Sequence, residues 1–407
     1  RPRPKHCKTF HSGASLFGIR TSNTFFGILM GNTLSAMHII ANADTWMEDS
    51  AIEQLKKTSQ LPGMVAVAGM PDLHPGRGYP VGAAFLSTGM FYPALVGNDI
   101  GCGMAFYQTD LAKAKWSGQK LAHKVGSVDG PLDEQWEQDI AAFGFAQHPH
   151  AQSLGTIGGG NHFAEMQQVE SLYVSKDELM TKAPWLNPKC LQLLVHSGSR
   201  GLGESILRAH IDEHNHNGLV AGTDDAARYM DQHDRALAFA SANRQLIGQR
   251  ILAKLRTSAT LGLNVHHNYV ESVQHEGQTH WLHRKGATPS NQGLVVIPGS
   301  RGDYSYLVEP IPSDKSLFSL AHGAGRKWKR SDCLGKLGSR VRFEDLLRTD
   351  LGSTVVCSDK ALIFEEAPQA YKNVGSVVAS LVEAGLVVPL ARFKPVMTYK
   401  KQEVCEC

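Results

Sequence analysis

The sequence predicts an α+β protein, and three observations favour that class. Strand-like apolar runs and amphipathic stretches intermix along the chain without the regular rhythm of a parallel α/β fold. No repeat has a fixed period, and no low-complexity linker divides the chain. With 407 residues, 42% of them hydrophobic, the chain can bury a large core. We therefore expect one intertwined domain over residues 30–401.

The N-terminal elements are predicted in chain order. The segment 48–58 is amphipathic and is expected to form the first helix. The apolar segment 64–76 is expected to be a strand that runs into a turn, and 81–87 a second strand. The apolar run FYPALV at 91–96, just before Gly97, is also expected to be a strand.

The later elements include the longest predicted helix. Residues 132–146 and 225–256 are expected to be helical, the second because apolar residues recur at helical spacing between charges. Segments 355–368 and 372–400 close the chain with alternating strand and helix signals.

The net charge of +3 is unevenly distributed. Residues 1–29 contain five Arg or Lys and no acid, so the remainder of the chain carries −2. That balance does not indicate a nucleic-acid partner, and any RNA-binding surface must be a local patch. We expect residues 1–29 to be a non-native or disordered extension ahead of Met30, although their Arg-rich, acid-poor composition also fits a transit peptide.

The cysteine pattern and the hydropathy of the chain indicate the cellular setting. Seven cysteines follow no regular framework, so a reducing, cytoplasmic setting is expected rather than a disulfide scaffold. No run of 18 apolar residues appears, and no membrane span is predicted. Residues 402–407 are expected to be a disordered tail, with Cys405 and Cys407 as a weak alternative metal pair.

Glycine gathers in loops that also hold His, Asp, Cys, Ser or Arg. Such loops let the backbone approach a ligand and free amide groups to face anions. Six of them suggest one polar site assembled from strand ends. They are DLHPGRGYPVG (72–82), GNDIGCGM (97–104), GTIGGGNHFAE (155–165), HSGSRGLG (196–203), IPGSRGDYSY (297–306) and AHGAGRKWKR (321–330).

Several of these loops carry possible metal ligands, which are Asp99, Cys102, His162, His196 and one of His266 and His267. A thiolate beside a cation is deprotonated and can bridge two metals. Imidazole and thiolate donors suit zinc, cobalt, iron or manganese, but the spacing is not that of a zinc finger. Each of these residues alone would more often be a buried core side chain. Because they share a glycine-rich setting, a metal site is favoured for the group more than for any single member.

Other loops could bind anions or supply a nucleophile. The amides of GGGNHF could surround a phosphate, and Arg200 and Arg301 offer planar forks for phosphate oxygens. HRKGATP (283–289) adds two cations and a hydroxyl; ordinary solvated turns are the alternative. His322, among small residues, could be a further ligand, a general base, or a nucleophile that attacks an α-phosphate.

Seven ordered motifs together resemble the RtcB family of RNA ligases over roughly residues 72–400. They are GNDIGCGM, GTIGGGNHFAE, HSGSRGLG, HHNYVE, HRKGAT, IPGSRGDYSY and AHGAGR. The resemblance implies mixed sheets flanked by helices around a central metal cleft. It also implies joining of an RNA 3′-phosphate or 2′,3′-cyclic phosphate to a 5′-hydroxyl with GTP and Mn²⁺, in RNA repair or tRNA splicing. We expect a monomer; the sequence does not determine the oligomeric state or a helper protein.

Residue roles follow from the same resemblance. Asp99, Cys102 and His162 would hold one manganese ion, and Cys102, His196 and His267 the second. His267 is preferred to His266 because the family's ligand directly precedes Asn, here Asn268. His322 matches the histidine that becomes guanylylated. The resemblance assigns GTP to Asn161, His162, Phe163, Ala164, Glu165, His267, Asn268, Pro298, Gly299, Ser300, Arg301, Ser305, His322, Gly323, Ala324, Gly325 and Lys400.

The motifs also depart from the common family pattern. Asn98 precedes the metal-binding Asp, Arg301 and Asp303 stand in PGSRGDYSY, and KWKR follows the nucleophile loop. These departures indicate a divergent subgroup. A metal-dependent phosphohydrolase or cyclic phosphodiesterase acting on RNA ends is the alternative enzyme. A non-catalytic RNA-binding protein with a structural metal is the alternative outside catalysis.

Overall fold

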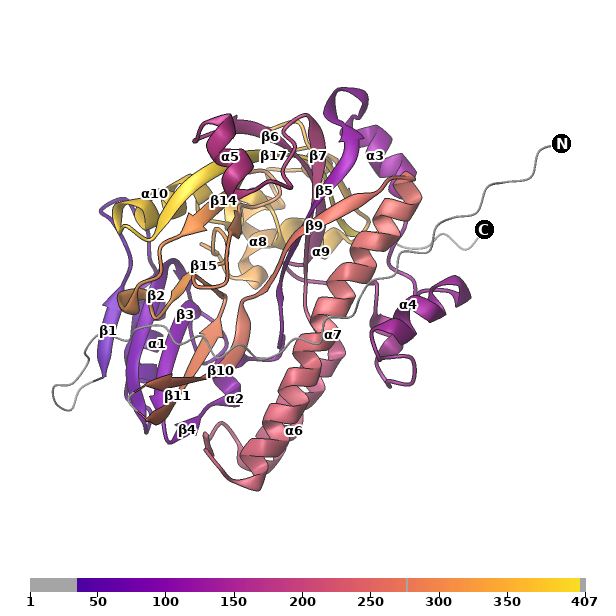
Figure 1. The fold of residues 1–407 in the computed structure, drawn as a ribbon. Coiled ribbons are helices and arrows are strands. Elements are labelled where there is room, and N and C mark those ends of the chain that lie inside the picture. The colour runs from indigo at the N-terminus through magenta and orange to yellow at the C-terminus, as the bar shows by residue number, and fades with distance from the viewer. Residues whose placement is uncertain (1–34, 276, 403–407) are drawn as a thin grey trace.

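The computed structural model describes residues 35–275 and 277–402. The extension predicted for residues 1–29 lies outside the described residues, as does all of the predicted tail beyond 402. Within the described ranges, strands and helices intermix along the chain as the α+β prediction requires, and the class is confirmed (Figure 1). No helix in those ranges combines the length and the apolar character that a bilayer crossing needs.

One sheet is built from the N-terminal strands and a central hairpin. Its order is β1 (Ala36–Ile39), β2 (Met64–His74), β3 (Val81–Thr88), β11 (Gln278–Lys285) and β10 (Asn268–His275). Only the β1–β2 pair is parallel. The two strands predicted nearby are confirmed, and so is the first helix, α1 (Asp49–Ser59). Leu55 of α1 and Leu73 of β2 are fully buried together, so the apolar stripe of α1 fixes it on this sheet.

A larger sheet carries most of the site. Its order is β13 (Val295–Pro298), β14 (Ser305–Pro310), β17 (Val387–Lys401), β6 (Phe163–Leu172), β7 (Cys190–Ser197), β5 (Gly103–Ala112) and β9 (Ala259–His266). All of these neighbours are antiparallel, and β16 (Thr354–Cys357) joins β17 in parallel. Two short pairs complete the strands: β12 (Ala287–Pro289) with β15 (Ser319–Ala321), and β4 (Met90–Phe91) with β8 (Leu219–Val220).

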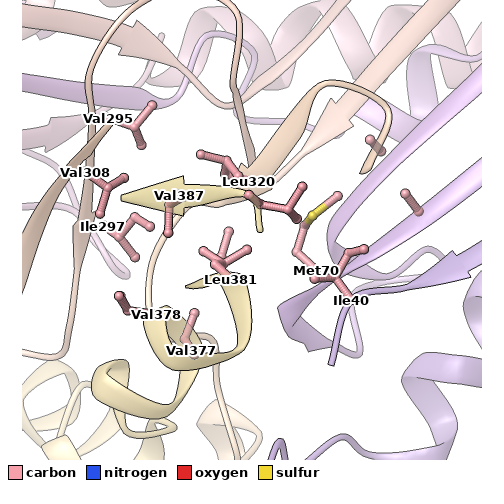
Figure 2. Close-up of a cluster of buried hydrophobic side chains, with 14 of the residues drawn as sticks. Ile40, Met70, Val295, Ile297, Val308, Leu320, Val377, Val378, Leu381 and Val387 are labelled. Atoms are coloured by element: carbon pink, nitrogen blue, oxygen red, sulfur yellow. The ribbon is translucent and has the colours of Figure 1, made fainter. Parts of the chain in front are cut away.

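A shared hydrophobic cluster joins the two larger sheets through α10 (Val374–Glu383) (Figure 2). Met70 comes from the first sheet, Ile297 from the second, and Leu381 from α10; all three are fully buried. Truncating a leucine in such a position to alanine costs about 2–5 kcal/mol. The cluster therefore holds the two sheets at a fixed distance behind the site.

The longest helix, α7 (Asp224–Leu255), runs beside α6 (Gly201–His214) along one side of the molecule (Figure 1). Thr223 caps α7 by accepting a hydrogen bond from the amide of Ala226, and two aspartates in the first turn favour the positive end of the helix dipole. Apolar residues three and four apart, such as Ile247 and Ile251, pack on the larger sheet. The helix predicted at 225–256 is confirmed.

Two other expectations were wrong or only partly right. The run 91–96 is not a strand: β4 ends at Phe91, and α2 (Pro93–Val96) follows. Pro93 lacks the amide that a ladder needs, but it fits the first turn of a helix. The helix predicted at 132–146 is a 3₁₀ turn, Glu134–Trp136, and a short α4 (Glu137–Ala142), which is followed by Gly144 at φ +80°.

The remaining helices are short. They are α3 (Gly118–Val125), α5 (Lys176–Lys182), α8 (Arg330–Leu337) and α9 (Lys360–Glu365). The order β16, α9, α10 and β17 confirms the alternation of strand and helix predicted near the C-terminus.

Candidate functional site

Strand register brings the predicted metal ligands together. Asp99 and Cys102 lie in the turn before β5, His162 directly precedes β6, His196 is in β7, and His267 follows β9. His196 is paired with Met104 on one side and with Phe163 on the other, while Gly103 is paired with His266. The ends of four neighbouring strands therefore meet, although their residues are far apart in sequence.

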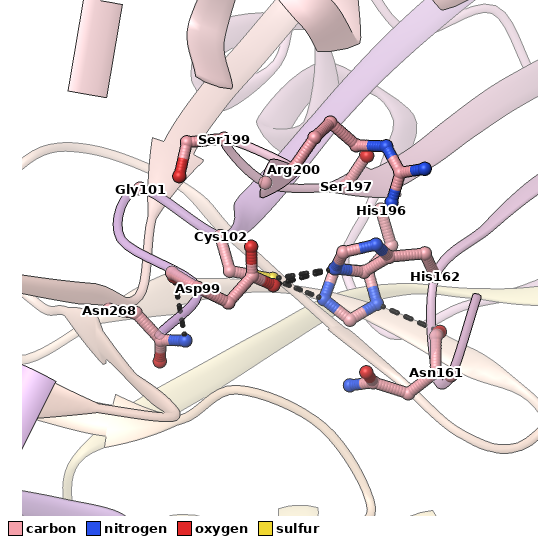
Figure 3. A network of polar contacts seen from close by, with 12 residues as sticks. Asp99, Gly101, Cys102, Asn161, His162, His196, Ser197, Ser199, Arg200 and Asn268 are labelled. Atoms are coloured by element: carbon pink, nitrogen blue, oxygen red, sulfur yellow. Dashed lines mark hydrogen bonds and ion pairs between the residues drawn. The ribbon is translucent and has the colours of Figure 1, made fainter. Parts of the chain in front are cut away.

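The predicted ligand atoms form a continuous chain of contacts, and Figure 3 shows the part made by Asp99, Cys102, His162 and His196. His162 Nε2 lies 2.7 Å from Asp99 Oδ2 and 3.4 Å from Cys102 Sγ. Cys102 Sγ lies 3.1 Å from His196 Nε2, which lies 3.4 Å from His267 Nε2. Gly198 leaves room for this group, since a Cβ there would overlap the Asp99 carboxylate. All five predicted ligands converge, with the Cys102 sulfur in the middle.

Burial sets the protonation of these groups. It lowers the pKa of His196 and His267 well below the ordinary value, and neighbouring imidazoles add to the effect, so both rings are neutral and able to donate a lone pair. Burial raises the pKa of the Cys102 thiol, and the Asp99 charge raises it further. A bound cation reverses that preference by favouring the thiolate. The site is therefore built to take up positive charge.

The rings of the two adjacent histidines make different contacts. His267 Nε2 reaches His196, and its backbone amide donates to Cys102 O. His266 Nδ1 instead lies 2.8 Å from Gly101 O and 3.2 Å from an Arg244 nitrogen. His266 is the last residue of β9 and His267 lies in the bend that follows it, and of the two rings it is that of His267 that contacts the ligand group. The placement agrees with His267 as the ligand.

Two consecutive residues of α7 clamp the loops that carry the ligands. Arg244 is fully buried and donates to Gly101 O at 2.8 Å and to Ser197 O at 2.9 Å. Asn243, also fully buried, accepts from the Gly155 amide and donates to Ser197 Oγ. This single turn of helix thus bonds to three of the glycine-rich loops. Sequence reasoning missed it, because nothing in the helical pattern separates these two residues from core positions.

His322 follows β15 and is held by an aspartate from the first sheet. Its Nδ1 lies 2.6 Å from Asp72 Oδ2, and its backbone amide is 3.3 Å from the same oxygen. Because a carboxylate accepts, Nδ1 carries the proton and Nε2 keeps the lone pair. The His322 ring centroid is 4.8 Å from that of His267, the ligand nearest to it. Asp72 belongs to one of the six glycine-rich loops, which was the signal that could have found it.

A cavity of about 730 Å³ opens onto this group. Most residues that the resemblance assigns to GTP line it, including Asn161, Glu165 and Lys400. Three of the assigned residues do not line the cavity. Ala164 and Ser305 are buried, and the His162 ring contacts Asp99 and Cys102. The cavity therefore unites the predicted nucleophile, metal ligands and most predicted nucleotide contacts.

Three arginines predicted to offer guanidinium groups to anions have protein partners. Arg301 donates to the carbonyls of Glu366 and Ile363, so its guanidinium binds the end of α9. Arg284 is fully buried and donates to Ser319 Oγ and Tyr269, and it also pairs with Glu271. Arg200 Nε lies 3.4 Å from Thr156 Oγ1. Lys285, next to Arg284, does line the cavity, and burial lowers its pKa to about 8.

Glu366 is a buried carboxylate that the sequence analysis did not single out, and it forms ion pairs with three cations of the cavity wall. Glu366 lies 3.0 Å from an Arg326 nitrogen and 3.4 Å from nitrogens of Arg330 and Lys400. Burial alone would raise the pKa of Glu366, but Lys400 and the two arginines hold it at about 2. This network fixes the amine of Lys400, which also donates to Gly160 O.

Comparisons with known proteins agree with the geometry. Residues 54–128 and 130–401 match the family model described as tRNA-splicing ligase RtcB. The chain is 55% identical to RNA-splicing ligase RtcB2 of an Escherichia coli strain, covering 90% of this chain and 96% of that protein. It is 30% identical to RNA-splicing ligase RtcB of Escherichia coli K12, covering 82% and 90% of the two chains. It is also 30% identical to tRNA-splicing ligase RtcB of Nanoarchaeum equitans, covering 87% and 92%. The chain therefore belongs to the RtcB family of RNA-splicing ligases.

Proposed function

We propose that the protein joins an RNA 3′-phosphate or 2′,3′-cyclic phosphate end to a 5′-hydroxyl end, using GTP and Mn²⁺. One observation carries the proposal: His322, oriented by Asp72, faces the ligand group around Cys102 across one cavity. A metal site that is only structural has no need of an oriented nucleophile beside it. A cytoplasmic monomer acting in RNA repair or tRNA splicing completes the proposal.

The donor set fits a pair of divalent ions. Atoms of Cys102, His162 and His196 lie within 4.8 Å of one another, and Asp99 and His267 extend the group at either end. The His162 Nδ1 atom is buried without a hydrogen-bond partner. Asp99, Cys102 and His162 would hold one ion and Cys102, His196 and His267 the other. When bound, such ions supply charge neutralisation for phosphates and lower the pKa of a nearby water or hydroxyl.

The contact with Asp72 and the position in the cavity support His322 as the nucleophile. Its Nε2 lone pair attacks the α-phosphorus of GTP, the bond to the β-phosphate oxygen breaks, and pyrophosphate leaves with that electron pair. Asp72 stabilises the positive charge that the ring acquires, as a carboxylate does in a His–Asp pair. The small residues Gly323 and Ala324 leave the ring accessible from the cavity.

The nucleotide is then passed to RNA. An oxygen of the RNA 3′-phosphate attacks the phosphorus held by His322, and the P–N bond breaks, which restores the imidazole. If the end is cyclic, water opens it first. The 5′-hydroxyl of the second RNA attacks the activated 3′-phosphate and GMP leaves, so a phosphodiester forms. Arg326 and Arg330 line the cavity wall, where their positive charges stabilise the closely spaced negative phosphates.

Labelling with GTP tests the proposal. Incubation with Mn²⁺ and α-labelled GTP should give an acid-labile label that survives denaturation and disappears in His322→Ala. A metal-dependent phosphohydrolase with the same loops would release product and leave the protein unlabelled. In an end-joining assay, a 3′-phosphate and 5′-hydroxyl pair should join, whereas a 3′-hydroxyl and 5′-phosphate pair should not.

A further inference from the structure

The segment Arg326–Arg348, which follows His322, concentrates positive charge beside the site. It contains eight Lys or Arg and three Asp or Glu, a net charge of +5. Taking away this +5 and the +5 of residues 1–29 from the chain's +3 leaves −7 for all other residues. The chain as a whole is close to neutral, but this segment is strongly basic and the residues outside it and outside 1–29 are acidic.

The basic segment divides into an inner and an outer set. Arg326 and Arg330 are paired with buried Glu366, so part of their charge is used inside the protein. Lys327 and Lys329 are exposed, and neither makes an ion pair with any residue in the described ranges. Their side chains face solvent. The outer set is thus available to an external anion.

An aromatic ring stands between these lysines. Trp328 is partly exposed and packs at its base against the buried cluster around Leu337 and Ile363, which fixes its orientation. Lys336 of α8 places its amine 4.9 Å from the Trp328 ring centroid. A packed aromatic ring with one cation over it and two beside it in the chain offers the combination that binds single-stranded nucleic acid, because bases stack on aromatic rings while ammonium groups meet phosphates.

This surface is continuous with the catalytic cavity. Lys327, Trp328 and Lys329 line the same cavity as His322 and His267. A strand lying across the outer surface would therefore lead its end to His322 without crossing another element. A short acidic peptide could meet the lysines, but it would make no use of the ring.

We propose that Lys327, Trp328, Lys329 and Lys336 bind the RNA strand next to the end that reacts, through phosphates and one stacked base. The inference rests on the proposed function and specifies where its RNA substrate lies. Recognition of this kind is independent of sequence, favours single strands and is sensitive to salt.

Salt-dependent binding tests the surface. Anisotropy of a labelled single-stranded RNA of about 20 nucleotides with a 3′-phosphate is measured between 50 and 200 mM KCl, without GTP. The triple variant Lys327→Ala, Lys329→Ala, Lys336→Ala should lower the slope of log affinity against log salt by about 2, since each phosphate contact contributes about 0.7. Over this fourfold change in salt, the unaltered protein should then lose about 18-fold more affinity than the variant.

A matched triple variant provides the control. Lys115, Lys120 and Lys124 are exposed, and Lys120 lies 4.5 Å over the Trp116 ring, so the same local chemistry occurs on α3. Replacing these three by Ala should leave the salt slope unchanged. Trp328→Leu, which keeps the apolar contact and removes the stacking face, should weaken binding several-fold with the slope retained.

The proposal is overturned if the Lys327, Lys329 and Lys336 variant keeps the unaltered slope, or if the control variant loses as much. Thermal unfolding midpoints of all variants separate loss of binding from loss of folding. The measurement needs no GTP, so it stays distinct from the proposed reaction. A protein that is never labelled at His322, yet loses RNA affinity only in the first variant, would overturn the reaction and keep the surface.

Discussion

Replacing Asp72 by asparagine should strongly slow the covalent labelling of His322 while the fold is retained. The two side chains are nearly the same size, and Asp72 is fully buried, so no cavity forms. What changes is the partner of His322 Nδ1, which now lies 2.6 Å from a carboxylate oxygen. The variant therefore removes the carboxylate charge and changes the hydrogen bonding of His322 without a change in volume.

The structure limits what the amide can do. If its oxygen faces His322, its NH₂ occupies the position of Asp72 Oδ1, which is buried and has no hydrogen-bond partner. That arrangement loses a charge-assisted bond worth about 1.5–3 kcal/mol and leaves a buried donor unpaired. If the amide is reversed, its NH₂ donates to Nδ1, the ring proton moves to Nε2, and the nucleophilic lone pair is lost. The first arrangement slows labelling by about 10²-fold, and the second approaches the 10⁴-fold effect of a wrong tautomer.

The assay is the initial rate of His322 labelling from α-labelled GTP at saturating Mn²⁺. Asp129→Asn is the matched control, since that carboxylate also accepts from two donors, Tyr399 Oη and the Gln402 amide, away from the ligands. It should leave the labelling rate unchanged. Labelling of Asp72→Asn at the unaltered rate, with a normal unfolding temperature, would refute the assignment of Asp72 as the residue that orients His322.

Three further outcomes are expected. Arg244→Met should weaken Mn²⁺ binding about 10- to 100-fold in calorimetry, because the turns beside the ligands lose their hydrogen bonds to Arg244. Arg250→Met removes hydrogen bonds from the same helix to three carbonyls, and it should lower stability without that loss of Mn²⁺ affinity. Cys102→Ser should reduce bound manganese, measured by elemental analysis, below two ions per chain, and a full complement would exclude a shared sulfur. Glu366→Gln should destabilise the protein by about 3–5 kcal/mol at neutral pH, because three buried or half-buried cations lose their anion. The pKa of Glu366 is about 2 in the folded protein and 4.5 ordinarily, so the stability that its charge contributes is complete above pH 4.5 and is lost as pH falls toward 2. The difference in unfolding free energy between the unaltered protein and Glu366→Gln should therefore narrow over that range.

Part of the fold was readable from local pattern. The α7 helix was predicted within a residue at each end, because its cap and its apolar spacing are local properties. The run FYPALV was misread, since hydrophobicity alone does not separate a buried helical turn from a strand, and the proline should have decided between them. The strands that hold or adjoin His162, His196 and His267 were not predicted as a sheet, because their pairing depends on partners distant in sequence.

Residue types along the chain set the chemical inventory of this protein: a carboxylate, a thiol and several imidazoles in glycine-rich loops, and a histidine among small residues. These are properties of residue type and local backbone freedom, which neighbours in the chain fix. The glycine-rich loops and the family resemblance indicated which groups share a site, but the contacts and partners of those groups depend on packing. Strand register brought His267 to the group of predicted ligands, packing paired Arg284 and Arg301 with protein groups, and the first sheet supplied Asp72 to His322. Side-chain direction and long-range pairing arise only when sheets and helices bury their apolar faces against one another, so no local pattern contains them.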